Sequence, residues 1–154
     1  MWYHGTVPAL TGHSLDFTMN PTEFLKSIYL GDRACKALLI DSWKKRVAIQ
    51  VNVISRLKPG AKTWEFNSDA DIKDGWLVFS DVRSLRFEPA GPLPNDFINE
   101  VSVDLIDAVG SQRCLFELSI GSVDESGNST EVLVRIDAHR IHLEDPLKPG
   151  IEIT

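Results

Sequence analysis

The residues best suited to chemistry in this 154-residue chain are the aspartates of the stretch NSDADIKDG, residues 67–75. Asp69, Asp71 and Asp74 fall within six positions, and carboxylates so close together could bind a cation or a basic protein. A helix-loop-helix calcium loop needs a glycine at its sixth position and a glutamate at its twelfth. Counted from Asn67 or from Asp69, these positions hold neither residue. We therefore predict a hairpin connection closed by Asp74-Gly75.

The sequence contains no motif for catalysis or for a cofactor. It has neither a Gly-x-Ser-x-Gly elbow nor a glycine-rich phosphate loop. His139 and His142 are three positions apart in a predicted strand, which directs their rings to opposite faces unless a bulge intervenes. Cys35 and Cys114 share the alternation phase of core residues, and we interpret them as buried thiols. We therefore predict no enzymatic activity, no cofactor and no metal.

Length and composition are those of an ordinary globular domain. Hydrophobic residues make up 43% and charged residues 25% of the chain, and its length favours a single domain over residues 1–154. The N-terminus lacks a basic, apolar leader, and no run approaches the roughly 20 apolar residues of a membrane span. Buried thiols suit a reducing compartment. These features predict a cytoplasmic protein that does not contact a membrane.

Charge is distributed unevenly along the chain. The net charge of −6 argues against nucleic acid as a partner, because phosphate binding needs a basic surface. Residues 33–62, the basic block, carry eight basic side chains against one acidic; residues 65–107, the acidic block, carry ten acidic against three basic. Such blocks often pair across neighbouring strands. The alternative is a partner surface, in which the acidic block attracts a basic protein.

One helix is predicted, over about residues 21–30. Asn20 can cap it, Pro21 suits its first position, and Glu23 completes a capping box. Gly31 stands where a left-handed C-terminal cap is expected. This short helix should precede the sheet.

The rest of the chain alternates polar and apolar residues with the period of β-strands. The predicted strands lie at residues 35–40, 46–55, 63–66, 76–87, 101–106, 114–120, 132–138 and 141–143. Polar connections at 41–45 and 124–129 predict hairpins, and the prolines of 89–94 predict a loop. The predicted fold is α+β, mostly β: an antiparallel sheet of about seven or eight strands, rolled or folded as a sandwich, with the helix at an edge.

Two positions interrupt the alternation. Near Asp81 the apolar residues switch faces, which we interpret as a bulge or bend. They switch again at His139-Arg140, which we interpret as another bulge. Residues 97–109 are ambiguous, because 97–101 could be helical whereas 101–105 alternate as a strand does. The pattern does not decide whether this segment is a helix or a strand.

Tryptophans near charge add a candidate for partner binding. Trp43 and Trp64 lie next to basic or turn residues, and Trp76 opens a strand. Exposed aromatic residues can be binding hot spots, although partly buried anchors at strand ends are commoner. The candidate partner-binding residues are Trp64, Asp69, Asp71, Asp74 and Asp81.

Several segments together resemble small β-rich bacterial immunity proteins of polymorphic toxin systems, and related bacterial families of unassigned function. The segments are VAIQVNVI, the loop carrying Trp64, WLVFSDVRSLRF, the stretch with Asn95 and Ile98, and the strands LFELSI and VLVRIDAHRIHL. The similarity spans about residues 35–143. It implies a compact antiparallel domain that neutralises a cognate toxin in the cytoplasm without catalysis. It transfers no site residue, because the toxin-facing positions of such families vary.

The expected function is thus a non-catalytic protein-binding module, such as an immunity protein, whose acidic block contacts a basic toxin. One alternative is a small-ligand binder or enzyme that uses the interior of the β-roll. Another is a structural or assembly subunit that self-associates through an edge strand. A continuous acidic surface without a pocket favours the first function, and a deep cavity lined by histidine, aspartate and cysteine favours the ligand binder.

Overall fold

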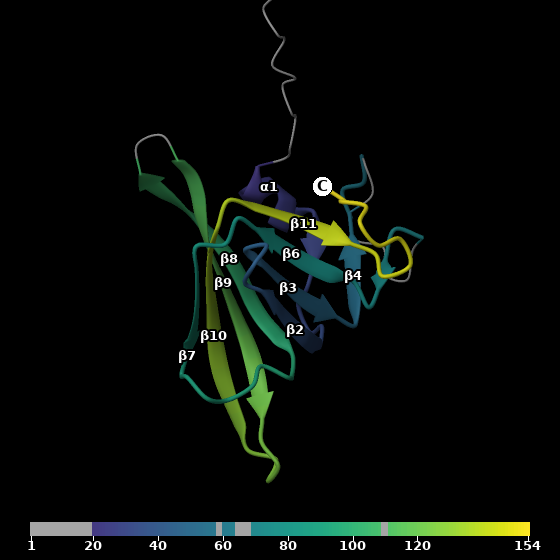
Figure 1. Cartoon of the computed structure of the whole chain (residues 1–154). Coiled ribbons are helices and arrows are strands. Elements are labelled where there is room, and N and C mark those ends of the chain that lie inside the picture. Colours follow the sequence, from purple (N-terminus) through teal and green to yellow (C-terminus); the bar gives the residue numbers. More distant parts are fainter. Residues whose placement is uncertain (1–19, 58–59, 64–68, 109–110) are drawn as a thin grey trace, which may run out of the picture.

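The computed structural model of the chain describes residues 20–57, 60–63, 69–108 and 111–154. Over these residues the protein has one short helix and eleven strands, arranged in three antiparallel sheets (Figure 1). The predicted fold class, mostly β with a short N-terminal helix, is confirmed. The predicted strand at 63–66 lies largely outside the described residues.

The helix α1 (Pro21–Lys26) is shorter than the predicted 21–30. Its start is as expected, because the Asn20 side chain accepts a hydrogen bond from the backbone N–H of Glu23 at 2.9 Å. It ends at Ser27, because the next residues form strand β1 (Ile28–Tyr29) and pair with a strand of the chain's smallest sheet. Tertiary strand pairing thus overrides a helical pattern.

Two four-stranded sheets form the body of the protein. The first has the order β11-β6-β3-β2 and the second has the order β7-β10-β9-β8. The strands of the first sheet are β2 (Cys35–Asp41), β3 (Arg46–Val51), β6 (Trp76–Ser80) and β11 (Arg140–Glu144). Those of the second are β7 (Ser84–Glu88), β8 (Ile98–Ala108), β9 (Ser111–Val123) and β10 (Ser129–Ala138). In Figure 1 the long strands of the second sheet cross those of the first at a steep angle.

The core lies between the inner faces of these sheets. Phe79 of β6 and Phe116 of β9 meet edge to face, with ring centroids 5.1 Å apart, and both are fully buried. Alternate residues of β9 and β10 point inward in register, as Leu118 opposite Val134 illustrates. Full burial of one such side chain contributes about 1.5–3 kcal/mol. The two sheets therefore form a sandwich with one apolar layer, as the alternation predicts.

The two predicted phase changes are crossings between the sheets. After β6 the chain turns at Asp81, whose φ is +53°, and passes into β7 of the other sheet. After β10 it bends at His139 and returns to the first sheet as β11. The bend predicted near Asp81 is confirmed, whereas the bulge predicted at His139-Arg140 is wrong, because the chain passes there into the other sheet. An apolar phase must switch when a strand moves to the opposite layer of a sandwich.

The predicted strand 46–55 breaks at Asn52. Its side-chain oxygen accepts the backbone N–H of Ala34 at 3.0 Å, and the chain continues as β4 (Val53–Arg56) in a small third sheet of order β1-β4-β5. The third strand, β5 (Ile72–Lys73), lies inside the stretch NSDADIKDG. This stretch is therefore no simple hairpin, because β5 pairs with β4 while Asp74, at φ +53°, turns the chain into the first sheet.

Residues 98–108 are a strand, which settles the ambiguity over 97–109 for this segment. β8 pairs with β9 along its length, with a register shift between Ile98 and Glu100. The hairpins predicted at 41–45 and 124–129 are confirmed, since they join β2 to β3 and β9 to β10. Residues 89–94 form no helix or strand, as their prolines predict.

Candidate binding sites

The candidate partner-binding residues that the structure describes lie around strand β6 and in the segment before it. Asp69 is exposed in a turn and Asp71 is half-buried before β5. Asp74 precedes β6 and Asp81 follows it, so the strand separates them. Asp74 also forms an ion pair of 2.7 Å with Lys36, a residue of the basic block. Trp64 lies outside the described residues. The described candidates are thus spread over the length of β6, and one of their charges is paired within the chain.

A buried ion cluster joins the two crossings. The Asp137 carboxylate accepts hydrogen bonds from Arg83, at 2.6 and 2.9 Å, and from Nε of Arg113, at 2.7 Å. Arg113 also donates to the backbone carbonyl of Asp81 at 2.8 Å, and the backbone N–H of His139 donates to the carbonyl of Ser80 at 3.1 Å. We call this side of the sandwich the closed edge. It is a structural joint, because its ion pairs and backbone bonds tie the two crossings to each other.

The charge state of Asp137 follows from this environment. Burial raises the pKa of its carboxyl group, but hydrogen bonds and charge from Arg113 and Arg83 outweigh burial, so the pKa lies below its ordinary value. Asp137 is therefore ionised at neutral pH. The sequence could not reveal this cluster, because Asp137 is 24 residues from Arg113 and 54 from Arg83.

A second polar network covers the outer face of β6. Arg46 of β3 and Glu144 of β11 form an ion pair of 2.7 Å, and Val78 of β6 lies between them in the register and is fully buried. Nε2 of the buried His142 lies 3.1 Å from Glu144, and its Nδ1 lies 4.0 Å from Glu152. The C-terminal residues are held to β11 by the backbone hydrogen bonds between Leu143 and Ile153, at 2.8 and 2.9 Å.

The two C-terminal histidines, His139 and His142, lie in different environments. His142 is buried between carboxylates, whereas His139 is exposed at the crossing. Burial raises the pKa of Glu144, but hydrogen bonds from His142 and Arg46 outweigh it and leave the pKa below its ordinary value. No group of three or more metal-binding side chains occurs in the described part of the chain.

The two cysteines are buried and unpaired, as predicted. Burial raises the pKa of the Cys35 thiol to about 11 and also raises that of Cys114. Because the thiolate is the reactive form, neither is suited to nucleophilic attack at neutral pH.

The most prominent exposed apolar residues lie on the β2–β3 hairpin. β2 is an edge strand; Leu39 is 47%, Ile40 54% and Trp43 96% exposed. Lys44 and Lys45 follow at the tip and are also exposed. We call these five residues the hairpin surface; Leu39 and Ile40 are neighbours in the strand and point to opposite faces of the sheet, so they flank the free edge from its two sides. The sequence had placed Trp43 beside basic residues, but its exposure could not be read from the pattern.

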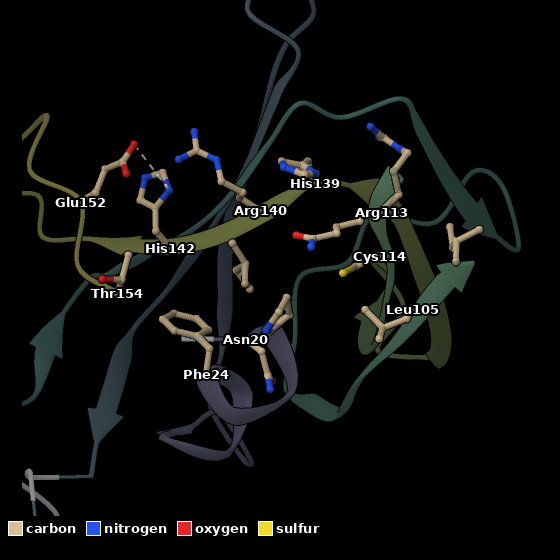
Figure 2. A pocket seen from close by; sticks show the side chains of 14 residues that line it. Asn20, Phe24, Leu105, Arg113, Cys114, His139, Arg140, His142, Glu152 and Thr154 are labelled. Carbon is tan, nitrogen blue, oxygen red and sulfur yellow. Dashed lines mark ion pairs between the residues drawn. The ribbon is translucent and has the colours of Figure 1, made fainter. Parts of the chain in front are cut away.

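A pocket lies at the end of the sandwich where α1, β8, β9 and β11 meet (Figure 2). We call it the end pocket; its volume is about 430 Å³. Its lining residues are Asn20, Pro21, Phe24, Leu105, Ile106, Gln112, Arg113, Cys114, His139, Arg140, Ile141, His142, Glu152 and Thr154. The lining includes histidines and a cysteine but no aspartate. The pocket therefore meets only part of the expectation for a ligand binder, which was a cavity lined by histidine, aspartate and cysteine.

Comparison with known proteins identifies the family but no activity. The model of DUF6258, a family of unknown function, matches residues 19–154, and the chain belongs to this family. No curated protein and no solved structure matches the chain. Among the described residues, no helix is long and apolar enough to cross a membrane.

Proposed function

We propose that this chain is a non-catalytic protein-binding domain and that the hairpin surface is its contact site. The observation that carries the proposal is Trp43, 96% exposed at the tip of a hairpin whose edge strand also exposes Leu39 and Ile40. Fully solvated tryptophan is uncommon, and interface hot spots are enriched in it. A partner that buries Trp43 would recover the free energy that its exposure costs.

The free edge of β2 supports the same surface. β2 pairs with β3 on one side, and the isolated bridge between Ala34 and Phe97 lies just before the strand. From Ala37 to Asp41 no strand of the described chain pairs with its other side. An exposed apolar edge is a template for an added strand. The partner can therefore contribute backbone hydrogen bonds as well as apolar contacts.

The charges around Trp43 define the kind of partner surface. Lys44 and Lys45 are exposed and form no ion pair within the described residues, while Lys36 is neutralised by Asp74. The surface that complements the hairpin is an apolar depression with an acidic rim. A basic partner would instead contact the acidic block. Mutations in the hairpin surface and in the acidic block can distinguish these two kinds of partner.

In its most specific form, the proposal is that the chain neutralises a toxin. The resemblance of residues 35–143 to immunity proteins supports this form. So does the absence of a catalytic motif in the sequence. A toxin whose contact face is acidic would use the hairpin surface, and one whose contact face is basic would use the acidic block.

The experiment is co-expression with the product of the neighbouring reading frame, followed by affinity measurement. Trp43→Ala should weaken binding by at least about thirtyfold, the effect of a hot-spot residue. Leu147→Ala is the matched control, because Leu147 is 88% exposed in a segment distant in sequence from the hairpin. It should leave the affinity unchanged.

Charge variants distinguish the two partner types. Lys44→Glu with Lys45→Glu should weaken binding, mostly through the association rate at low salt. Asp69→Lys with Asp71→Lys should have no effect. The reverse pattern would move the site to the acidic block, and a neighbour that does not bind would remove the toxin-neutralising form. Dimerisation of the chain that Trp43→Ala abolishes would favour an assembly subunit.

A further inference from the structure

The end pocket exists because the inner face of β8 is incompletely covered. Leu105 pairs with Cys114 of β9, and both side chains point toward the core side of the sheet. Cys114 is 1% exposed, yet Leu105 is 71% exposed. An inward-facing leucine this exposed marks a part of the apolar layer that no segment of the described chain fills.

The pocket has an apolar wall drawn from four elements. Phe24 comes from α1, Leu105 from β8, Cys114 from β9 and Ile141 from β11, and Figure 2 shows these elements surrounding one space. The volume of about 430 Å³ lies in the range of roughly 300–1,000 Å³ that small-molecule sites occupy. The wall can therefore take the apolar body of a small ligand.

Three basic side chains stand beside this wall, and two of them are arginines. Arg113, His139 and Arg140 project on the same side in Figure 2, away from Phe24. The Arg113 guanidinium is engaged with Asp137, but Arg140 is exposed and forms no ion pair in the described part of the chain. Glu152 is the acidic side chain of the lining, and it faces His142 at 4.0 Å. An anionic group near Arg140 would find a cation without a partner.

We propose that the end pocket binds a small amphipathic carboxylate. Its apolar body lies against Phe24, Leu105 and Ile141, and its carboxylate reaches the side of the pocket where His139 and Arg140 stand. Eight of the fourteen lining residues are polar, among them Gln112, exposed at the start of β9, so the apolar wall lies beside a polar one that can take the ligand's head group. This site is independent of the hairpin surface.

Binding should be non-covalent. Burial raises the pKa of the Cys114 thiol, so the sulfur at the wall acts as an apolar atom and not as a nucleophile. No bond to the ligand needs to form or break.

The test is calorimetric titration of the full chain with decanoate, kept below its micelle-forming concentration, and with decan-1-ol. Decanoate should bind with one-to-one stoichiometry and more tightly than the uncharged alcohol. Leu105→Trp should fill the pocket and weaken binding at least tenfold. It should still fold, because residue 105 is 71% exposed. Leu93→Trp, at a position 75% exposed in the proline-rich loop, is the control and should bind normally.

The charge is tested separately. Arg140→Gln should weaken decanoate binding about fivefold at low salt, with the difference shrinking as salt screens the charge. Arg86→Gln, which removes an arginine that is 71% exposed on the other sheet, should leave binding unchanged. The proposal is overturned if decanoate does not bind at millimolar concentration, or if Leu105→Trp binds it as the parent chain does. Equal affinity for the alcohol would contradict the anionic head.

Discussion

The two long sides of the sandwich are built differently. At the closed edge the chain crosses twice between the sheets, and Asp137, Arg83 and Arg113 tie the crossings together. At the opposite side, which we call the open edge, β2 and β8 are the last strands of their sheets, and the backbone bonds between them in the described part of the chain lie where both strands begin, around the bridge of Ala34 and Phe97. The closed edge is held by two chain connections between the sheets and by ion pairs. The open edge lacks such connections in the described chain, and its strands expose apolar side chains.

This difference shows where binding can occur without loss of stability. Phe116 and Leu105 both face inward from the second sheet, yet Phe116 is fully buried and Leu105 is 71% exposed. Leu105 and the edge strand of the hairpin surface belong to the open edge, whereas the hairpin tip reaches the crossing after β6, where the Lys45 carbonyl accepts a hydrogen bond from the backbone N–H of Val82 at 2.9 Å. The exposed side chains of both proposed sites are ones whose burial the fold does not require, and the end pocket adds buried core residues such as Phe24.

The largest expected effect is the difference in stability between variants of these two inward-facing residues. Phe116→Ala should lower the free energy of unfolding by about 3–5 kcal/mol, because it removes the ring that packs on Phe79 and leaves a cavity. Leu105→Ala should change it by no more than about 0.5 kcal/mol. Urea denaturation of both variants measures the difference. Similar losses would show that the open edge is as much a part of the core as the closed one.

The next effect concerns the ion cluster of the closed edge. Asp137→Asn should destabilise the fold by about 2–3 kcal/mol, because the mostly buried Arg113 loses its counter-charge. Arg83 is more than half exposed and contributes less. Asp104→Asn, on the exposed part of β8, should be neutral within about 0.5 kcal/mol in the same denaturation assay. A neutral Asp137→Asn would show that the crossings alone close this edge.

Acid should weaken both the ion cluster of the closed edge and the polar network over β6. The pKa values of Asp137 and Glu144 are lowered in the folded state, so both carboxylates stabilise the protein above their unfolded pKa values, near 3.9 and 4.3. That stability is lost as the pH falls through the folded values. The unfolding free energy should therefore decline below about pH 4.5, and Asp137→Asn should make the decline shallower. If the variant's unfolding free energy declined with pH as steeply as that of the parent chain, Asp137 would not be a carboxylate whose pKa is lowered by folding.

The smallest effect should come from the hairpin tip. Trp43→Ala should alter the free energy of unfolding by less than about 0.5 kcal/mol, because the side chain buries almost nothing in the free protein. Thermal unfolding of the isolated variant measures this. A large loss would mean that Trp43 serves the fold and would remove it as a contact residue.

Local pattern was enough to predict most of the strands and the class of fold. Inward-facing residues such as Val134 and Leu118 repeat every second position, because each strand buries one face. The capping signal of Asn20 located the start of α1 but not its end, since Ile28 and Tyr29 gain more by pairing with β4 than by extending the helix. Boundaries set by distant partners are invisible in a local pattern.

The candidate sites were harder to predict for the same reason. Charge counts defined an acidic block, but strand order sends Asp74 and Asp81 to opposite ends of β6 and pairs Asp74 with Lys36. The end pocket combines residues from α1, β8, β9 and β11, which only the sheet topology brings together. The exposure of Trp43 likewise depends on β2 being an edge strand.

Because Asn20 and Thr154 both line the end pocket, any sequence fused after residue 154 emerges at that pocket. An affinity tag placed there would stand beside the proposed ligand and could itself occupy the apolar wall. The loop at Glu125–Gly127 joins the ends of β9 and β10 that lie farthest from the pocket, at the lower tip in Figure 1. A label inserted in that loop would leave both the pocket and the hairpin surface clear for measurement.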